Sequence, residues 1–174
     1  MPTMRRGSRR QFLLIPVLLL AAACAGVPTV EEALEVQELQ TGYDDGGVEA
    51  GQNRLLPTVS FKLRNKDARS INSVQVNAVF RVVEDPEELG SQSVWAIDYK
   101  GLPGGQTVGP FVMRSRFGYS GEQARVDMFQ HEGFKDVVVQ VFAKQGGNQW
   151  VKLTEQVIER QLLAIAPSPA KAAQ

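Results

Sequence analysis

Apolar and polar residues alternate along the middle of the chain, and this period of two predicts β-strands. In the segment 58–65, Val59, Phe61 and Leu63 alternate with polar residues. Successive side chains of a strand point to opposite faces of a sheet, so such a segment has one face for a core and one for water. The same alternation predicts further strands over 74–83, 94–100, 107–119, 134–144 and 150–155.

The alternation also predicts which side chains share a face. In 94–100, Trp95, Ile97 and Tyr99 fall on one side of the strand. In 107–119, four large residues do so: Phe111, Met113, Phe117 and Tyr119. Two further strands have a nearly continuous apolar side, which we expect to face the core: Val74, Val76, Ala78, Phe80 and Val82, and Val137, Val139, Val141 and Ala143.

Turn-forming residues separate these segments. Glycine-rich turns are predicted at 43–47 and 101–105, and the segment 145–148 is typical of a tight hairpin. The acidic, proline-containing segment 84–88 ends the strand before it, because proline has no amide donor and like charges repel a pairing strand.

Only one segment favours a helix. Ala124, Met128 and His131 lie at helical spacing within 121–131. The period of 30–41 is ambiguous, and 157–165 could either continue the preceding strand or form a helix. Six or seven short strands without long amphipathic helices between them predict an all-β fold. We expect an antiparallel, immunoglobulin-like β-sandwich of about seven strands with one short helix.

The first 23 residues have the pattern of an export signal. Four arginines, including Arg9 and Arg10, precede the apolar run 12–23, which is shorter than the roughly 20 residues that a membrane-spanning helix needs. The segment 8–14 around Arg9 and Arg10 resembles the twin-arginine export consensus, whereas the strongly apolar run suits the general secretory route. Both routes remain open.

Cys24 is the only cysteine of the chain. Together with the three alanines before it, it resembles the lipobox of bacterial lipoproteins. The resemblance implies cleavage between Ala23 and Cys24 and a diacylglycerol and acyl anchor on Cys24, which holds a protein on a membrane stably. Since Ala25 is not aspartate, the resemblance favours the outer membrane, facing the periplasm. The alternative is cleavage after Ala23 that releases a soluble periplasmic protein.

The rest of the chain divides simply. We expect a lipidated tether over 24–33, the sandwich domain over 34–165 and a disordered Ala/Pro/Lys-rich tail over 166–174. Four of the 19 basic residues lie in the signal, so the mature chain has 15 basic and 19 acidic residues and a net charge of −4. This charge argues against a nucleic-acid surface.

One resemblance concerns the domain itself. The strand around Val59, Phe61 and Leu63, the turn at Asn65, the strand 74–80 and the turn 102–107 ahead of Phe111 resemble the small immunoglobulin-like FxLYD modules of bacterial envelope proteins. The resemblance covers 57–141, without the tyrosine and aspartate of the name. It implies a fold and an extracytoplasmic setting.

Candidates for chemistry are few. His131 is the only histidine, and a nucleophilic site would have to combine it with Asp127 and Ser120; a surface histidine is the simpler interpretation. The serine is not in a nucleophile elbow, because Glu122 stands where a glycine is needed.

The acidic and glycine-rich segments also lack the spacing of a ligand site. Asp44, Asp45 and the carboxylates of 84–88 lack the order of a calcium loop, and 101–109 lacks the Gly-Lys-Ser/Thr ending of a phosphate loop. We therefore expect no metal and no cofactor.

Six aromatic residues lie in or beside the predicted strands, and we expect most of them in the core: Trp95, Tyr99, Phe111, Phe117, Tyr119 and Trp150. Trp95 and Tyr99 are the candidate binding patch, because their strand follows the acidic turn and is expected at a sheet edge. The sequence thus predicts a non-enzymatic, lipid-anchored envelope protein that binds or helps to assemble a partner protein. The alternatives are a carrier of an apolar ligand between the sheets and a carbohydrate- or peptide-active accessory enzyme using His131.

Overall fold

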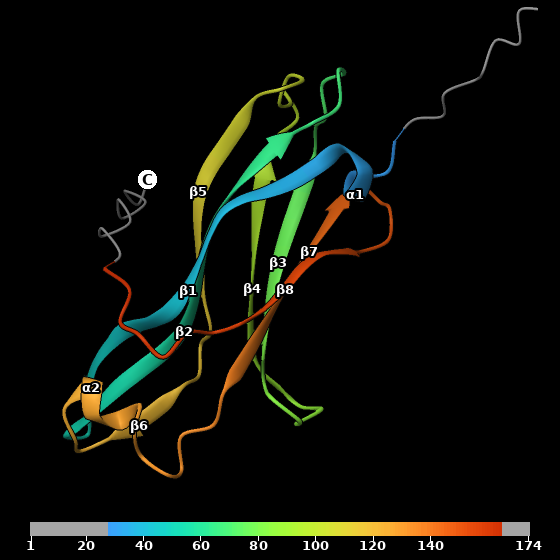
Figure 1. Cartoon of the computed structure of the whole chain (residues 1–174). Coiled ribbons are helices and arrows are strands. Elements are labelled where there is room, and N and C mark those ends of the chain that lie inside the picture. The colour runs from blue at the N-terminus through green and yellow to red at the C-terminus, as the bar shows by residue number, and fades with distance from the viewer. Residues whose placement is uncertain (1–27, 165–174) are drawn as a thin grey trace, which may run out of the picture.

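The computed structural model describes residues 28–164 of the chain. The predicted signal with Arg9 and Arg10, the cleavage site at Ala23 and Cys24, and the tail 166–174 lie outside the described residues. The described residues form two four-stranded antiparallel sheets that pack face to face (Figure 1). This confirms the predicted all-β sandwich.

In each sheet, some hydrogen-bonded neighbours are strands that do not follow one another in the sequence. The first sheet has the order β1-β2-β5, and β6 also pairs with β2. Its strands are β1 Leu34–Glu49, β2 Gln52–Asn65, β5 Thr107–Arg114 and β6 Tyr119–Gly121. The second sheet has the order β4-β3-β7-β8. Its strands are β3 Val74–Val82, β4 Glu88–Ile97, β7 Val137–Gln145 and β8 Val151–Val157.

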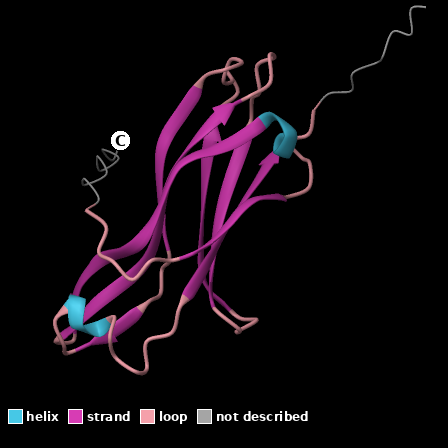
Figure 2. Cartoon of the chain, in the orientation of Figure 1, coloured by secondary structure: helices cyan, strands magenta, loops and turns pink. Residues whose placement is uncertain are grey.

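Two helices of four residues complete the described fold, α1 Val30–Ala33 and α2 Arg125–Met128 (Figure 2). The sequence predicted only α2. α1 begins with a capping box, in which the Thr29 hydroxyl accepts from the Glu32 amide and the Glu32 carboxylate accepts from the Thr29 amide. Although α1 lies in the stretch that we assigned to the tether, Val30 and Ala33 are buried in the core.

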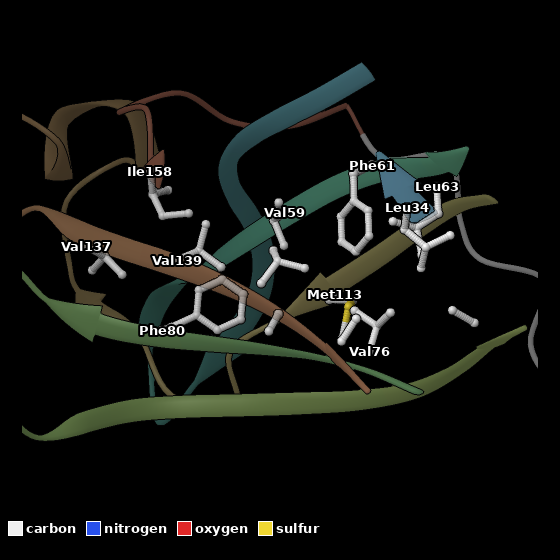
Figure 3. Close-up of a cluster of buried hydrophobic side chains, with 14 of the residues drawn as sticks. Leu34, Val59, Phe61, Leu63, Val76, Phe80, Met113, Val137, Val139 and Ile158 are labelled. Atoms are coloured by element: carbon white, nitrogen blue, oxygen red, sulfur yellow. The ribbon is translucent and has the colours of Figure 1, made fainter. Parts of the chain in front are cut away.

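The core lies between the sheets, where alternate residues of facing strands interdigitate (Figure 3). Phe61 and Met113 come from the first sheet and Phe80 from the second, and all three are fully buried. The predicted inward residues of β2 and β7 are buried, as are those of β3 as far as Phe80. Alternation therefore located these strands correctly, because burial on one face is what the alternation encodes.

The sandwich has two distinct ends. The α1 end consists of α1, the loops 66–73 and 98–106, and the turn between β7 and β8; the α2 end consists of α2, β6 and the turns after β1 and β3 (Figure 1). At the α1 end, the Lys66 amide donates to the Ala33 carbonyl and the Gly146 amide to the Ser73 carbonyl. The described chain enters the fold at this end.

The predicted turn at 43–47 is wrong, because β1 continues through it. Asp45 pairs with Leu55 and Val48 with Asn53, so Gly46 and Gly47 together face one residue of β2 and form a β-bulge. The reversal comes later, at Ala50 and Gly51, which both have positive φ. Glycine in a strand often marks a bulge, and here that role was mistaken for a turn.

A second bulge changes the face of Trp95. β4 begins at Glu88, earlier than predicted, and near its end Gln75 pairs with Trp95 whereas Val74 pairs with Ile97. Ala96 is therefore the extra residue, Ile97 turns into the core and Trp95 turns to solvent. The prediction that Trp95, Ile97 and Tyr99 share one face is wrong.

The predicted strand over 107–119 is two strands. β5 ends at Arg114, the Ser115 amide donates to the Pro57 carbonyl, and pairing with β2 resumes at Tyr119 in β6. Met113 is buried and Phe111 and Tyr119 pack against the core as predicted, whereas Phe117 lies in the break and is 57 % exposed. The interruption takes Phe117 off the inward face.

After β8, which ends at Val157, the chain crosses from the second sheet to the first. The described part of the undecided segment, 157–164, contains no helix. We call residues 158–164 the C-terminal strap. The Tyr43 amide donates to the Gln161 carbonyl at 2.8 Å, and the Leu163 amide donates to the Tyr43 carbonyl at 2.9 Å. Gly42 permits this approach, since a Cβ there would lie 2.7 Å from Cγ of Leu163.

Candidate functional site

Trp95 lies on the outer face of the second sheet, and its side chain is 64 % exposed. Its strand, β4, is the edge of that sheet, as the sequence predicted. An indole carries a large apolar surface and one N–H donor, so its exposure to water leaves much of that surface without a partner. Trp95 is therefore a candidate contact residue, as the sequence suggested.

A second indole lies on the same side of the molecule. Residues paired across an antiparallel sheet share a face, and Gln75 pairs with Trp95 on one side and with Lys144 on the other. The Lys144 ammonium lies 4.8 Å from the ring centre of Trp150, which directly precedes β8 and is 40 % exposed. The two tryptophans thus lie at opposite ends of one row of outward-facing residues that crosses the sheet.

Tyr99 is the most exposed aromatic residue described, at 78 %. It lies in the turn after β4, where the Asp98 carboxylate accepts from the amides of Lys100 and Gly101. The Ser73 amide donates to the Asp98 carbonyl, so the turn is fixed to the start of β3. We call Trp95, Tyr99 and Trp150 the aromatic rim.

The aromatic rim lies at the α1 end. The row of Trp95, Gln75 and Lys144 is next to the last row of the sheet, in which Val74 pairs with Gln145. Gln145 and Pro28 line the same cavity of about 220 Å³. The described chain therefore enters the fold beside the turn that leads to Trp150.

Asn65 fixes the loops of this end. Its side chain is fully buried, and its amide group donates to the carbonyls of Arg69 and Leu102, both at 2.8 Å. Its carbonyl oxygen accepts from the Asp67 amide at 3.1 Å. One side chain thus joins the end of β2 to the loops 66–73 and 98–106.

At the α2 end, the structure brings together two of the three residues considered for nucleophilic chemistry. Ser120 and His131 line one cavity of about 430 Å³, whereas Asp127 is not among the described residues of its wall. His131 is exposed, and its Nδ1 accepts from the Gly133 amide at 3.1 Å. The arrangement is that of a histidine held by its own turn.

Beneath this cavity lies an aromatic cluster that the sequence did not predict. The ring of Tyr43 packs against Phe129 and Phe134, each at 5.3 Å between ring centres, and Tyr119 packs against Phe134 at 4.3 Å. Burial raises the pKa of Tyr43 well above its usual range, and its hydroxyl has no hydrogen-bond partner in the described structure. The sequence predicted Tyr43 in a turn, so this cluster was not predicted.

Arg160 of the strap closes the cluster on one side. Its guanidinium lies 5.2 Å from the ring centre of Phe134 and donates to the Asp136 carboxylate at 2.7 Å and to the Phe129 carbonyl at 3.0 Å. The hydrogen bond that it donates to Asp136 raises the pKa of this guanidinium further. Arg160 remains charged and joins the strap to the loop before β7.

Two of the acidic residues considered as cation ligands, Asp44 and Asp45, have arginine partners instead. Asp44 lies 2.6 Å from Arg114 and Asp45 lies 2.7 Å from Arg125. Within residues 28–164 there is no group of three or more His, Cys, Asp or Glu side chains placed to hold a metal ion. In the same range, no helix is long and apolar enough to cross a membrane.

Comparisons with known proteins give no relative from which to transfer a role. No protein-family model matches the chain, and no curated protein sequence matches it. The function must therefore be inferred from the residues and their arrangement.

Proposed function

We propose that this chain is a lipid-anchored protein of the bacterial cell envelope, on the outer membrane and facing the periplasm, whose sandwich binds another envelope protein without catalysing a reaction. The sequence supports the anchor through its arginines, its apolar run and the alanines before Cys24. The structure supports the binding module through a compact sandwich that begins only a few residues after that cysteine.

The proposal rests mainly on the short distance along the chain between Cys24 and the start of the fold. Four residue steps separate Cys24 from Pro28, and an extended chain covers at most about 14 Å in four steps. α1 follows directly and is packed into one end of the sandwich. An acyl anchor on Cys24 therefore holds the α1 end close to the lipid.

The α2 end is then the part presented to a partner. β1 has 16 residues and runs from the α1 end to the α2 end. At about 3.3 Å per residue this places the α2 end roughly 50 Å from the α1 end. Val126 of α2 is 58 % exposed there and lines a surface pocket with Phe129 and Leu162.

Two features favour binding over the alternatives. A nucleophilic triad needs its base oriented by a third group, and here Asp127 is not part of the cavity that Ser120 and His131 line. A carrier needs free space between its sheets, whereas the interior here is filled by fully buried side chains such as Phe61, Phe80 and Met113 (Figure 3). The surface is the remaining place for a ligand.

The test joins acylation to partner capture. Cells are fed a fatty-acid analogue, and the wild-type chain is compared with Cys24→Ala for label and for presence in the outer-membrane fraction. We expect label and membrane recovery only in the wild type. An unlabelled wild-type chain would contradict the anchor.

Partner capture uses a photoreactive amino acid at position 126 in intact cells. Position 93 is the matched control, since Ser93 is exposed in the middle of β4. We expect one envelope protein to be captured from position 126, not from position 93, and only when Cys24 is present. Equal capture from both positions, or capture unaffected by Cys24→Ala, would contradict the proposed orientation.

A further inference from the structure

We propose that the α1 end of the sandwich rests on the bilayer surface and that the aromatic rim of Trp95, Tyr99 and Trp150 lies among the lipid headgroups. This inference rests on the proposed function, because it requires the anchor at Cys24. The sequence suggested a protein partner for the surface around Trp95 and Tyr99; here we propose that this surface contacts lipid instead.

The first argument is distance. The described chain begins at Pro28, in the cavity that also includes Gln145, and Lys144 of the Trp95 row is the residue before Gln145. A tether that reaches at most about 14 Å cannot lift this end far from the acylated residue. The interfacial zone on each side of a bilayer is itself roughly 5–8 Å thick. The α1 end therefore lies within reach of the headgroups.

The second argument is chemistry. Tryptophan and tyrosine concentrate at membrane interfaces, because each has an apolar ring and a polar atom that needs water or a headgroup oxygen. All three residues of the aromatic rim are exposed, and they come from an edge strand, an ordered turn and the connection directly before β8. Three separate segments thus present the same kind of side chain at one end of the molecule.

The charges of the α1 end indicate which lipids it accepts. Together with the two strand rows next to it in each sheet, its basic and acidic side chains are equal in number: Arg64, Lys66, Arg69, Lys100 and Lys144, and Glu31, Glu32, Glu35, Asp67 and Asp98. With no net charge, the contact gains little from anionic lipids. We therefore expect it on zwitterionic phosphatidylcholine, with little dependence on salt.

The chain provides its own probe of this contact. Trp95 and Trp150 are its only tryptophans, so intrinsic indole fluorescence reports the α1 end alone. The acylated protein is purified from membranes, its acylation is verified by intact mass, and it is reconstituted into phosphatidylcholine vesicles that contain a headgroup spin-labelled lipid. Trp95→Phe and Trp150→Phe then separate the two indoles.

The control places an indole at the opposite end, by Val126→Trp in a chain that carries Trp95→Phe and Trp150→Phe. Val126 is nearly as exposed as Trp95 but lies on α2. We expect each native indole to be quenched at least twofold more strongly than this control indole, and its emission to shift to shorter wavelength on reconstitution. Far-UV circular dichroism verifies that each variant is folded.

Two results would overturn the inference while leaving the anchor in place. One is an acylated, vesicle-bound protein whose native indoles are quenched no more than the control indole. The other is capture of a protein, rather than lipid, by a photoreactive amino acid at position 99 in intact cells. A chain without acyl groups would instead contradict the proposed function, so the two failures are distinguishable.

Discussion

Replacing Asn65 by alanine tests whether one buried side chain holds the α1 end together. The Asn65 amide group donates to the carbonyls of Arg69 and Leu102, and its oxygen accepts from the Asp67 amide. Asn65→Ala removes all three hydrogen bonds from a fully buried position. The carbonyl of Leu102 keeps one donor, the Ile71 amide at 3.1 Å.

The expected cost follows from these bonds. A hydrogen bond within a protein contributes roughly 0.5–1.5 kcal/mol net, and an unsatisfied buried partner costs somewhat more. Three bonds therefore predict a loss of about 3 kcal/mol in the free energy of unfolding. With a urea m-value of about 2 kcal/mol/M, the midpoint of unfolding falls by roughly 1.5 M.

Urea titration followed by tryptophan fluorescence measures this shift. Asn77→Ala is the matched control, because Asn77 lies on the outer face of β3 and accepts a single hydrogen bond, from Ser93; we expect a change within about 0.5 kcal/mol. If Asn65→Ala costs no more than this control, the described hydrogen bonds do not hold the loops.

Asn65→Asp separates hydrogen bonding from packing. The carboxylate keeps the acceptor for the Asp67 amide but turns the two donated bonds into repulsion between its oxygen and two carbonyl oxygens. We expect a loss at least as large as that of Asn65→Ala at neutral pH, and partial recovery as acid protonates the carboxyl group. Equal stability of the two variants at every pH would refute the role of the amide donors.

Two further predictions concern the α2 end. Because burial raises the pKa of Tyr43, an unfolded chain loses this proton near the ordinary tyrosine value of about 10 while the folded chain keeps it, so stability is lost as the pH rises above about 10. Burial also raises the pKa of Tyr119, so Tyr43→Phe should lessen the alkaline fall in stability without abolishing it. At neutral pH the same change should be neutral or stabilising, because it removes a hydroxyl that has no hydrogen-bond partner in the described structure. An unchanged alkaline slope of the free energy of unfolding in urea titrations would contradict this. His131→Ala should change the free energy of unfolding by less than about 0.5 kcal/mol, since the side chain is exposed, and should leave capture from position 126 intact. Loss of capture from a folded His131→Ala protein would give the imidazole a direct role.

The strands were predictable because one face of each is buried. Val59, Phe61 and Leu63 of β2 are fully buried, and the four inward residues of β7 are nearly so. Alternation reports burial directly, so it located these segments and the sandwich class without knowledge of pairing. The pairing partners themselves remained unknown.

The sequence-based predictions were wrong where the pairing of the strands is irregular. Gly46 and Gly47 have the composition of a turn, and only the register with β2 shows that they form a bulge within β1. In β4, the extra residue Ala96 inverts the alternation, so Ile97 is buried while Trp95 is exposed. A bulge depends on the neighbouring strand, and the sequence of one strand does not contain it.

The candidate site was predicted in part. Trp95 and Tyr99 were expected at an exposed edge, and the structure confirms their exposure. Trp150 was expected in the core with most of the aromatics; its place two residues after the hairpin turn at 145–148 was the signal for exposure. That all three lie at the end where the chain enters depends on strand directions and order, which periodicity does not report.

The strap also constrains when the sandwich can close. Thr41 in β1 donates to the Val157 carbonyl and accepts from the Glu159 amide, and Gln161 donates to the Thr41 carbonyl, so these bonds join residues 116 to 120 positions apart. Contacts of such sequence separation form slowly. During synthesis, β1 therefore waits for residues 157–161 before these partners arrive. If the chain is threaded through a secretion pore in an extended state, β1 gains these partners only after residues 157–161 emerge on the far side.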